Sequence, residues 1–267
     1  MSNDVLAQLV SMSRHLGDPA LDYVILGEGN TSARADADTF WVKASGTELR
    51  TIDRPGFVRV SFDRALAILE ASDLTKGAAS LTDGEVKKRL VEARVDSATG
   101  IGPAPDDGVR PSVETVLHAI CLSLEGVNFV GHTHPTAINA LTCSAAFETA
   151  VSGRLFPDEI VLCGPAPVVV PYTDPGIPLA HGVRDLIERY IGEYRERPEV
   201  ILMQNHGLIA LGRTAQQVEN ITAMAVKAAR VLLGTYALGG PHFLTAEAVD
   251  RIHTRPDELY RRGVIGE

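Results

Sequence analysis

The sequence predicts a mixed α/β fold in which helices cover a central sheet. Three observations support this fold class: short β-rich apolar runs alternate with amphipathic helical segments, 45% of the 267 residues are hydrophobic, and no internal repeat is present. We therefore expect one domain over residues 1–267. Its one linker-like stretch, residues 72–110, is an excursion that is either a surface feature or a lid over a site.

Helices are predicted where apolar residues recur at a period near 3.6. The first covers residues 4–16 and is stopped by Gly17, Asp18 and Pro19. The others cover residues 62–70, 84–94, 112–124, 136–143, 182–194 and 214–233. Ser112 is the expected N-cap of its helix, and a capping box at residues 214–217 opens the last and longest one.

Strands are predicted for short runs of β-branched and aromatic residues. They cover residues 39–43, 129–134, 160–163 and 168–170, and a hairpin-like pair at 200–203 and 208–211. Two further stretches, residues 27–32 and 44–47, are expected to be turns because Gly, Ser and Asn dominate them.

Composition narrows the class of partner. The chain carries 25 Lys and Arg against 34 Asp and Glu, a formal net charge of −9, which disfavours nucleic acid and anionic membranes. No apolar run reaches the ~18 residues of a membrane span, and residues 1–13 lack the basic start and apolar stretch of a signal peptide. Cys121, Cys143 and Cys163 form no C-x-x-C pair and are expected to be buried, reduced thiols of a cytoplasmic protein.

Two histidines in the strand at 129–134 indicate a metal site. His132 and His134 are two positions apart, so their side chains leave the same face, which is the usual beginning of a zinc site. The alternative is a pair of ordinary histidines. His206, in a tight turn between two apolar strands, would complete a three-histidine site with an open position. His118, on the apolar face of its helix, is expected to be a core histidine.

Glu114 and the two turns are further candidates. In the first turn of its helix Glu114 is either a helix-dipole stabiliser or a general base or fourth metal ligand. The turns at 27–32 and 44–47, together with Ser112 at a helix start, offer N–H groups and hydroxyls to an anion. Neither turn matches a Walker or Rossmann fingerprint, and each alone is also typical of a simple turn.

The combination of these motifs resembles the class II aldolase/adducin family. In order along the chain, the motifs are Gly29-Asn30-Thr31-Ser32, Ser45-Gly46, Pro111-Ser112-x-Glu114, His132-x-His134 and Asn205-His206-Gly207-Leu208-Ile209. The resemblance covers roughly residues 5–235. Residues 41–47 and 110–115 are most similar to the sugar-aldolase branch, whose members occur alone or fused to a dehydrogenase, and we expect no such second domain here.

The resemblance implies a three-layer fold with a nine-stranded, mostly antiparallel sheet, and a homotetramer with sites at subunit interfaces. It also implies Zn²⁺, or another divalent metal such as Mn²⁺ or Co²⁺, held by His132, His134 and His206, with Glu114 as the catalytic acid/base. The phosphate-binding positions that it implies are Gly29, Asn30, Ser45, Gly46 and Ser112.

Two positions depart from the family pattern. Val113 stands where fuculose-phosphate aldolases carry a second serine, so we expect weaker selectivity for a phosphorylated substrate. The family's tyrosine proton donor has no clear counterpart, and Asp158, Glu159 and Tyr260 are the candidates to replace it.

The function implied by the resemblance is reversible cleavage of a ketose 1-phosphate to dihydroxyacetone phosphate and an aldehyde, through an enediolate stabilised by zinc. Within the family, a sugar-phosphate 4-epimerase, dehydratase or decarboxylase uses the same chemistry. More distant alternatives are a metallohydrolase, a cupin-type oxygenase and a non-catalytic adducin-like module. The H-x-H-x-D-H continuation of many metallohydrolases is absent after His134, as is the nearby Glu of a cupin, whereas the adducin branch lacks the three histidines present here.

Overall fold

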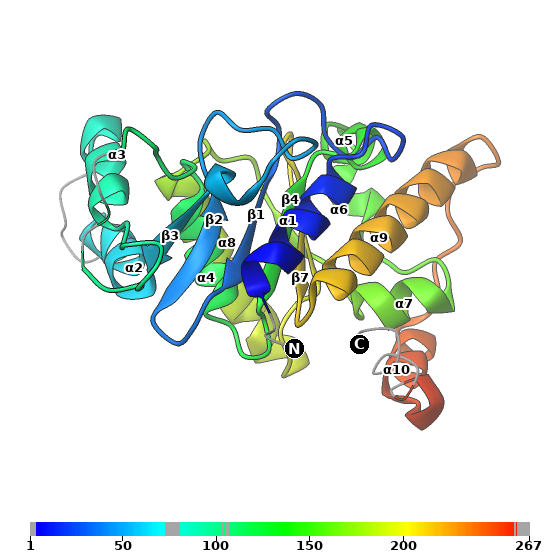
Figure 1. Ribbon diagram of the computed structural model, residues 1–267. Coiled ribbons are helices and arrows are strands. Elements are labelled where there is room, and N and C mark those ends of the chain that lie inside the picture. The colour runs from blue at the N-terminus through cyan, green and yellow to red at the C-terminus, as the bar shows by residue number, and fades with distance from the viewer. Residues whose placement is uncertain (1–3, 73–80, 103, 105–106, 259, 261–267) are drawn as a thin grey trace.

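A seven-stranded sheet runs through the part of the chain that the computed structural model describes, residues 4–72, 81–102, 104, 107–258 and 260 (Figure 1). In spatial order its strands are β3 (Phe57–Ser61), β2 (Thr39–Lys43), β1 (Asn30–Arg34), β4 (Phe129–Thr133), β7 (Gly207–Gly212), β6 (Val200–Met203) and β5 (Val168–Val170). Every neighbouring pair is antiparallel except β5 with β6. The α/β class and the antiparallel sheet are confirmed, with seven strands in the described residues rather than nine.

Helices cover both faces of this sheet. They are α1 (Val5–Leu16), α2 (Phe62–Ala71), α3 (Asp83–Glu92), α4 (Thr115–Leu122), α5 (Thr136–Thr142), α6 (Phe147–Ala150), α7 (Pro157–Cys163), α8 (Ile177–Tyr194), α9 (Ala215–Tyr236) and α10 (Ala246–Thr254), with a 3-10 turn, η1, at Arg54–Gly56. In Figure 1, α1 and α9 lie on one face, and α4 and α8 on the other. Three layers result.

The strands separate two buried apolar clusters. Along β4, Phe129 packs in the cluster that includes α1, α5 and α9, whereas its neighbour Val130 packs in the cluster that includes α2, α4 and α8. This alternation follows from the two-residue period of a strand, which sends successive side chains to opposite faces. Each face of the sheet is therefore buried, and polar side chains inside it require partners.

The stretch at 160–163 was expected to be a strand, and that prediction is wrong. These residues end helix α7, whose first turn contains Pro157, and Ile160, Val161 and Cys163 are its buried positions. Proline presets the helical φ at a first turn. A four-residue apolar run fits the buried face of a helix as well as it fits a strand, so the run alone could not distinguish them.

Strands β1 and β3 were not predicted. Residues 30–32 were expected to lie in a turn, but they begin β1, where their polar side chains are buried and paired; Thr31 Oγ1, for example, lies 2.6 Å from Ser13 Oγ. Ser112 is not the N-cap of α4, which begins at Thr115 after Glu114. Of the three cysteines, Cys143 is exposed rather than buried.

The excursion at 72–110 contains helix α3, as expected, and is attached to the sheet edge. The Val95 N–H donates to the Arg59 carbonyl oxygen over 3.0 Å, beside β3. The Arg94 Nη1 lies 2.8 Å from the Asp107 Oδ1. Residues 73–80, 103 and 105–106 lie outside the described residues. Nowhere in the described chain is a helix both long enough and apolar enough to span a membrane.

Candidate active site

The candidate site lies at one end of the sheet, where β1, β4 and β7 are neighbours (Figure 1). Asn30 on β1 lies opposite His132 on β4, and His132 lies opposite Ile209 on β7. Because these neighbours are antiparallel, the start of β1, the end of β4 and the start of β7 meet at the same end. Side chains from segments far apart in the sequence therefore lie close together at this end of the sheet.

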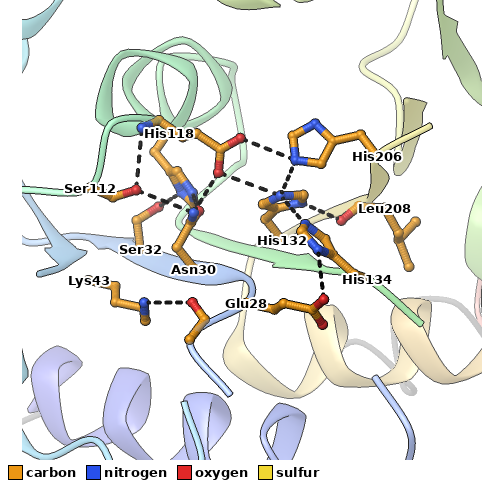
Figure 2. Close-up of polar contacts among 12 residues, drawn as sticks. Glu28, Asn30, Ser32, Lys43, Ser112, His118, His132, His134, His206 and Leu208 are labelled. Carbon is orange, nitrogen blue, oxygen red and sulfur yellow. Dashed lines mark hydrogen bonds and ion pairs between the residues drawn. The ribbon is translucent and has the colours of Figure 1, made fainter. Parts of the chain in front are cut away.

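Three histidines converge there (Figure 2). The ligand atoms of His132, His134 and His206 all lie within 4.8 Å of one another. The His132 Nε2 is 3.0 Å from His134 Nε2 and 3.3 Å from His206 Nε2. Two nitrogens bound at 2.0–2.1 Å to a tetrahedral metal lie about 3.3 Å apart. The donor set therefore fits a divalent cation.

The hydrogen bonds and protonation of the rings suit the same role. The His132 Nδ1–H donates to the Leu208 carbonyl oxygen over 2.9 Å, which leaves a lone pair on Nε2 facing the other two rings. Burial, together with the neighbouring imidazoles, lowers the pKa of His134 to about 3 and that of His206 to about 4. Both rings are neutral near pH 7, which is the form that binds metals.

The turn between β6 and β7 allows this approach. Asn205 has a φ of 53°, a left-handed conformation that asparagine tolerates better than most residues. A Cβ on Gly207 would lie 2.6 Å from the Thr133 carbonyl oxygen and 2.7 Å from His134 Cδ2. Glycine at this position is what lets the strand carrying His206 come so close to the end of β4.

Glu114, at the start of α4, faces the histidines from the other side. Its Oε2 is 3.5 Å from His132 Nε2, and its Oε1 is 3.5 Å from His206 Nε2. Burial opposes ionisation of Glu114, but the electrostatic interaction with the His132 and His206 side chains and a hydrogen bond from Asn30 outweigh burial and lower the pKa of Glu114 to about 2. Its Oε1 is buried and has no hydrogen-bond partner within the described residues. The site therefore presents an ionised carboxylate with one oxygen unused.

Three neighbours labelled in Figure 2, Asn30, Ser112 and His118, form a buried polar network on which Glu114 also depends. The Asn30 Nδ2 donates to Glu114 Oε2 over 2.6 Å and to Ser112 Oγ over 3.4 Å. On its other side Asn30 Oδ1 contacts His118 Nε2, and His118 Nδ1 lies 2.6 Å from Ser32 Oγ. His118 is thus buried and hydrogen-bonded, as expected of a core histidine, but its partners belong to the site.

The Ser45–Gly46 turn and Ser112 belong to two segments that lie side by side. Ser45 N donates to the Arg110 carbonyl oxygen over 2.8 Å, and Ser112 N donates to the Lys43 carbonyl oxygen over 3.2 Å. Two of the predicted phosphate-binding stretches are therefore joined by backbone hydrogen bonds. The Ser112 Oγ accepts from Asn30 and from the Glu114 N–H, so its own proton is available to a ligand.

Both predicted glycines adopt conformations that favour glycine. Gly29 has a φ of 68°, and a Cβ there would lie 2.6 Å from the His132 carbonyl oxygen. Gly46 has a φ of 82° and is exposed, with nothing near the position of a Cβ. Gly29 thus permits the close approach of β1 to the end of β4, and Gly46 is open to a ligand.

Lys43 is a site residue that the sequence analysis missed. Its side chain is buried, and its Nζ makes one long hydrogen bond within the described residues, 3.5 Å to the Gly27 carbonyl oxygen. Burial lowers the pKa of Lys43, against the attraction of Glu114 and Glu48. The available signal was its place directly before the Ala44–Thr47 turn, at the end of a strand that leads into the site.

The structure gives the three candidate proton donors different surroundings. Both oxygens of Glu159 are engaged, one by Arg154 Nη1 at 3.1 Å and the other by the Leu155 N–H at 2.8 Å. Asp158 precedes it in the first turn of α7, and Tyr260 is exposed near the end of the described chain. Glu159 is thus held in a structural ion pair, and the role of the other two stays a prediction.

The chain belongs to the family described as Class II Aldolase and Adducin N-terminal domain, which matches residues 7–233. Two curated relatives differ in their described activities. YuxG of Bacillus subtilis (strain 168), an uncharacterized oxidoreductase, is 27% identical over 198 residues, covering 71% of this chain and 24% of YuxG, so the chain spans about a quarter of that relative. The methylthioribulose-1-phosphate dehydratase of Leptospira interrogans serogroup Icterohaemorrhagiae serovar Lai (strain 56601) is 25% identical over 196 residues, covering 71% of this chain and 67% of that protein.

Solved structures support the same family and fold. The N-terminal class II aldolase domain of a conserved protein from Thermoplasma acidophilum is 29% identical, with a TM-score of 0.61, covering 87% of this chain and 95% of that one. An L-fuculose 1-phosphate aldolase at 17% identity has a TM-score of 0.64 over 95% of this chain and 96% of its own, which supports the fold.

Proposed function

We propose that this protein is a metal-dependent aldolase that reversibly cleaves a ketose 1-phosphate to dihydroxyacetone phosphate and an aldehyde. The observation that carries the proposal is the convergence of three imidazoles beside a buried carboxylate, with the Nε2 atoms of His132 and His206 each 3.5 Å from an oxygen of Glu114. His132, His134 and His206 would hold the cation, with zinc as the first choice and manganese or cobalt as alternatives. When bound, a divalent cation supplies Lewis-acid charge that polarises a chelating carbonyl and hydroxyl.

Glu114 is the proposed acid/base. Its Oε2 is occupied by the Asn30 amide, so Oε1 is the oxygen that takes a proton from the substrate and returns it. An ionised carboxylate at rest is the form required to accept a proton first. The surrounding burial excludes water from this exchange, which favours transfer to the substrate.

The proposed phosphate site lies beside this carboxylate. The family resemblance implies Asn30, the Ser45 and Ser112 hydroxyls and the backbone N–H groups of Gly29 and Gly46 as the phosphate-binding groups. We add the Lys43 amine, because a buried cation with one long hydrogen bond gains most from an anionic ligand. A phosphate held there would fix the carbon chain of the ketose relative to Glu114, and such positioning lowers the barrier by several kcal/mol.

The proposal extends to the state of the protein in the cell. We propose a cytoplasmic homotetramer whose sites lie at subunit interfaces, as the resemblance implies. Tyr260, Asp158 or a residue from another subunit would then supply the second proton. Sedimentation of the purified chain tests the oligomeric state directly.

A dehydratase is the second candidate. It is favoured by the methylthioribulose-1-phosphate dehydratase relative, which is 25% identical to this chain. The same Glu114 would then remove a proton from carbon beside the carbonyl, and water rather than an aldehyde would leave. The two reactions share the metal, the carboxylate and the phosphate site, and they differ in which bond to the substrate breaks.

A substrate panel separates the two candidates. The zinc-loaded protein is incubated with L-fuculose 1-phosphate, L-rhamnulose 1-phosphate and 5-methylthioribulose 1-phosphate, and the products are identified by mass. Dihydroxyacetone phosphate plus an aldehyde supports the aldolase, whereas a single product lighter by one water supports the dehydratase. His206→Ala protein serves as the inactive control, and turnover that survives this change would contradict the proposed site.

A further inference from the structure

A second buried histidine stands on the opposite side of Glu114 from the three proposed ligands. His118 follows Glu114 by four positions, so both leave the same face of α4 and its first turn. The His118 side chain is almost completely buried, with 1% of its surface exposed. A buried imidazole is costly unless both ring nitrogens have partners, and here both do.

Those partners fix which nitrogen carries the proton. The Asn30 Nδ2 donates to the ionised Glu114 Oε2, so the Asn30 Oδ1 is the atom that faces His118 Nε2. Because an amide oxygen only accepts, the His118 Nε2 must carry the hydrogen. The His118 Nδ1 then accepts from the Ser32 hydroxyl at 2.6 Å. Burial lowers the pKa of His118 to about 3, which agrees with a neutral ring carrying one proton.

The same contacts use every polar atom of the Asn30 amide. One Nδ2 proton goes to Glu114 and the other to Ser112, while Oδ1 accepts from His118. If the amide turned over, its oxygen would face the Glu114 carboxylate, and two acceptors 2.6 Å apart repel. The Asn30 side chain therefore keeps no proton for a substrate phosphate, although the family resemblance makes it a phosphate-binding position.

We propose that His118 is a positioning residue that acts through Asn30: its Nε2–H orients the Asn30 amide, which holds Glu114 Oε2 and leaves Oε1 as the oxygen that exchanges the proton. The inference rests on the proposed acid/base role of Glu114. It assigns the Asn30 side chain to the orientation of Glu114 rather than to the phosphate. The chain of contacts runs from Ser32 through His118 and Asn30 to Glu114.

Two amide substitutions at His118 separate the two ring nitrogens. His118→Gln places an N–H near the former Nε2 and keeps the donor to Asn30, whereas His118→Asn reaches only the former Nδ1 and keeps the contact with Ser32. We expect His118→Asn to lower kcat by 10–100-fold, the usual effect of an orienting partner, and His118→Gln to recover most of it. The substrate is the member of the panel that the wild-type protein turns over fastest.

Three readouts distinguish positioning from other roles. KM, inhibition by inorganic phosphate and zinc content should all stay within about twofold in both variants, because neither the phosphate site nor the three ligands change. Weaker inhibition by phosphate in His118→Asn would make the network part of the phosphate site and overturn the proposal. Equal losses of kcat in both variants, or no loss in either, would also overturn it.

A measurement on the unmodified protein tests the inference without activity. The ¹⁵N chemical shifts of His118 report which ring nitrogen is protonated, and we expect a protonated Nε2 and an unprotonated Nδ1 at neutral pH. A protonated Nδ1 would overturn the proposal even if neither variant folds. Should the protein turn over no member of the panel, the aldolase and dehydratase proposals fail, while the tautomer still decides whether the hydrogen-bonded chain exists.

Discussion

At the scale of single residues, the two oxygens of Glu114 are not equivalent. One accepts a hydrogen bond from Asn30, and the other is buried and accepts none from the residues that the structure describes. A buried acceptor without a hydrogen bond costs about 1–3 kcal/mol of folding stability. Such a cost is offset if a proton of the bound substrate occupies the free position. This arrangement agrees with the proposed acid/base role of Glu114, whereas a carboxylate that only stabilises a helix end would not require it.

Replacing Glu114 by Gln tests this distinction. The amide keeps the shape of the side chain but cannot exchange a proton, so we expect kcat to fall by about 10²–10⁴. Zinc content, measured by mass spectrometry of the metal, should remain near one per chain. Glu188→Gln, at an exposed position of α8 outside the proposed machinery, is the control. Loss of zinc would instead make Glu114 a ligand, and unchanged kcat would leave it a helix-end carboxylate.

Lys43 provides a second test at this scale. Lys43→Met keeps the length and the apolar stem of a buried side chain but removes the charge. A hydrogen bond to a charged group contributes about 1.5–3 kcal/mol, so kcat/KM for a ketose 1-phosphate should fall by roughly 10–100-fold. The value for the free ketose should change little. Lys88→Met, on exposed α3, is the control; an equal fall for both substrates would remove Lys43 from the phosphate site.

At the scale of elements, the β6–β7 turn determines how closely two of the histidines approach. Gly207→Ala would place a Cβ 2.6 Å from the Thr133 carbonyl oxygen, so the backbone must move. Such overpacking costs about 1–3 kcal/mol, and the movement should also weaken zinc binding through His206. Urea unfolding and a zinc titration measure the two effects.

The matched control for this turn is Gly192→Ala. Gly192 lies inside α8, and among the described residues no atom outside its own helix lies within 4 Å of the position of its Cβ. Alanine is favoured over glycine in a helix interior by about 0.5–1 kcal/mol, so this variant should be as stable as the wild-type protein or more so, with unchanged zinc affinity. If Gly207→Ala behaves like this control, the proposed close approach is not required.

The same scale shows which parts of the fold can be predicted from the sequence. Helices α1, α2, α3 and α9 and the β6–β7 hairpin were predicted because their apolar residues repeat over several turns or are bounded by clear turn residues. Strand β1 was missed because its first residues, 30–32, are polar and resemble a turn. Their burial depends on partners such as Ser13 and His118, which lie far away in the sequence. Local patterns carry no information on such partners.

Some residues of the candidate site can also be predicted from the sequence, whereas others depend on tertiary contacts. The His132 and His134 pair is visible from the two-residue period of a strand, and His206 from its turn. That Asn30 contacts Glu114 follows from the register of β1 against β4, which is a property of the sheet. The buried state of Lys43 likewise depends on the chain around it. Spacing therefore predicted the proposed ligands, and tertiary contacts determine the groups that orient the carboxylate.

At the scale of the whole molecule, the proposed metal links the middle of the sheet to overall stability. β4 and β7 are neighbours near the centre of the sheet, and the chain at their adjoining ends places the ligand atoms of His132, His134 and His206 within 4.8 Å of one another. A ligand that binds the folded but not the unfolded chain stabilises the protein by RT ln(1 + [L]/Kd), about 4.1 kcal/mol at 1,000 times Kd.

Removal of the metal should therefore destabilise the whole protein. We expect dialysis against EDTA to lower Tm by several degrees, since 1 kcal/mol corresponds to about 2–4 °C for a protein of this size, and stoichiometric Zn²⁺ should restore it. The folded His206→Ala protein lacks one of the three proposed ligands and should bind zinc more weakly. Its Tm should therefore change little on addition of EDTA or of Zn²⁺. His242→Ala, at an exposed histidine outside the cluster, should behave as the wild type does. A wild-type Tm that is the same with EDTA and with zinc would contradict the metal site, because three converging histidines that bind a cation in the folded protein must add that binding energy to its stability.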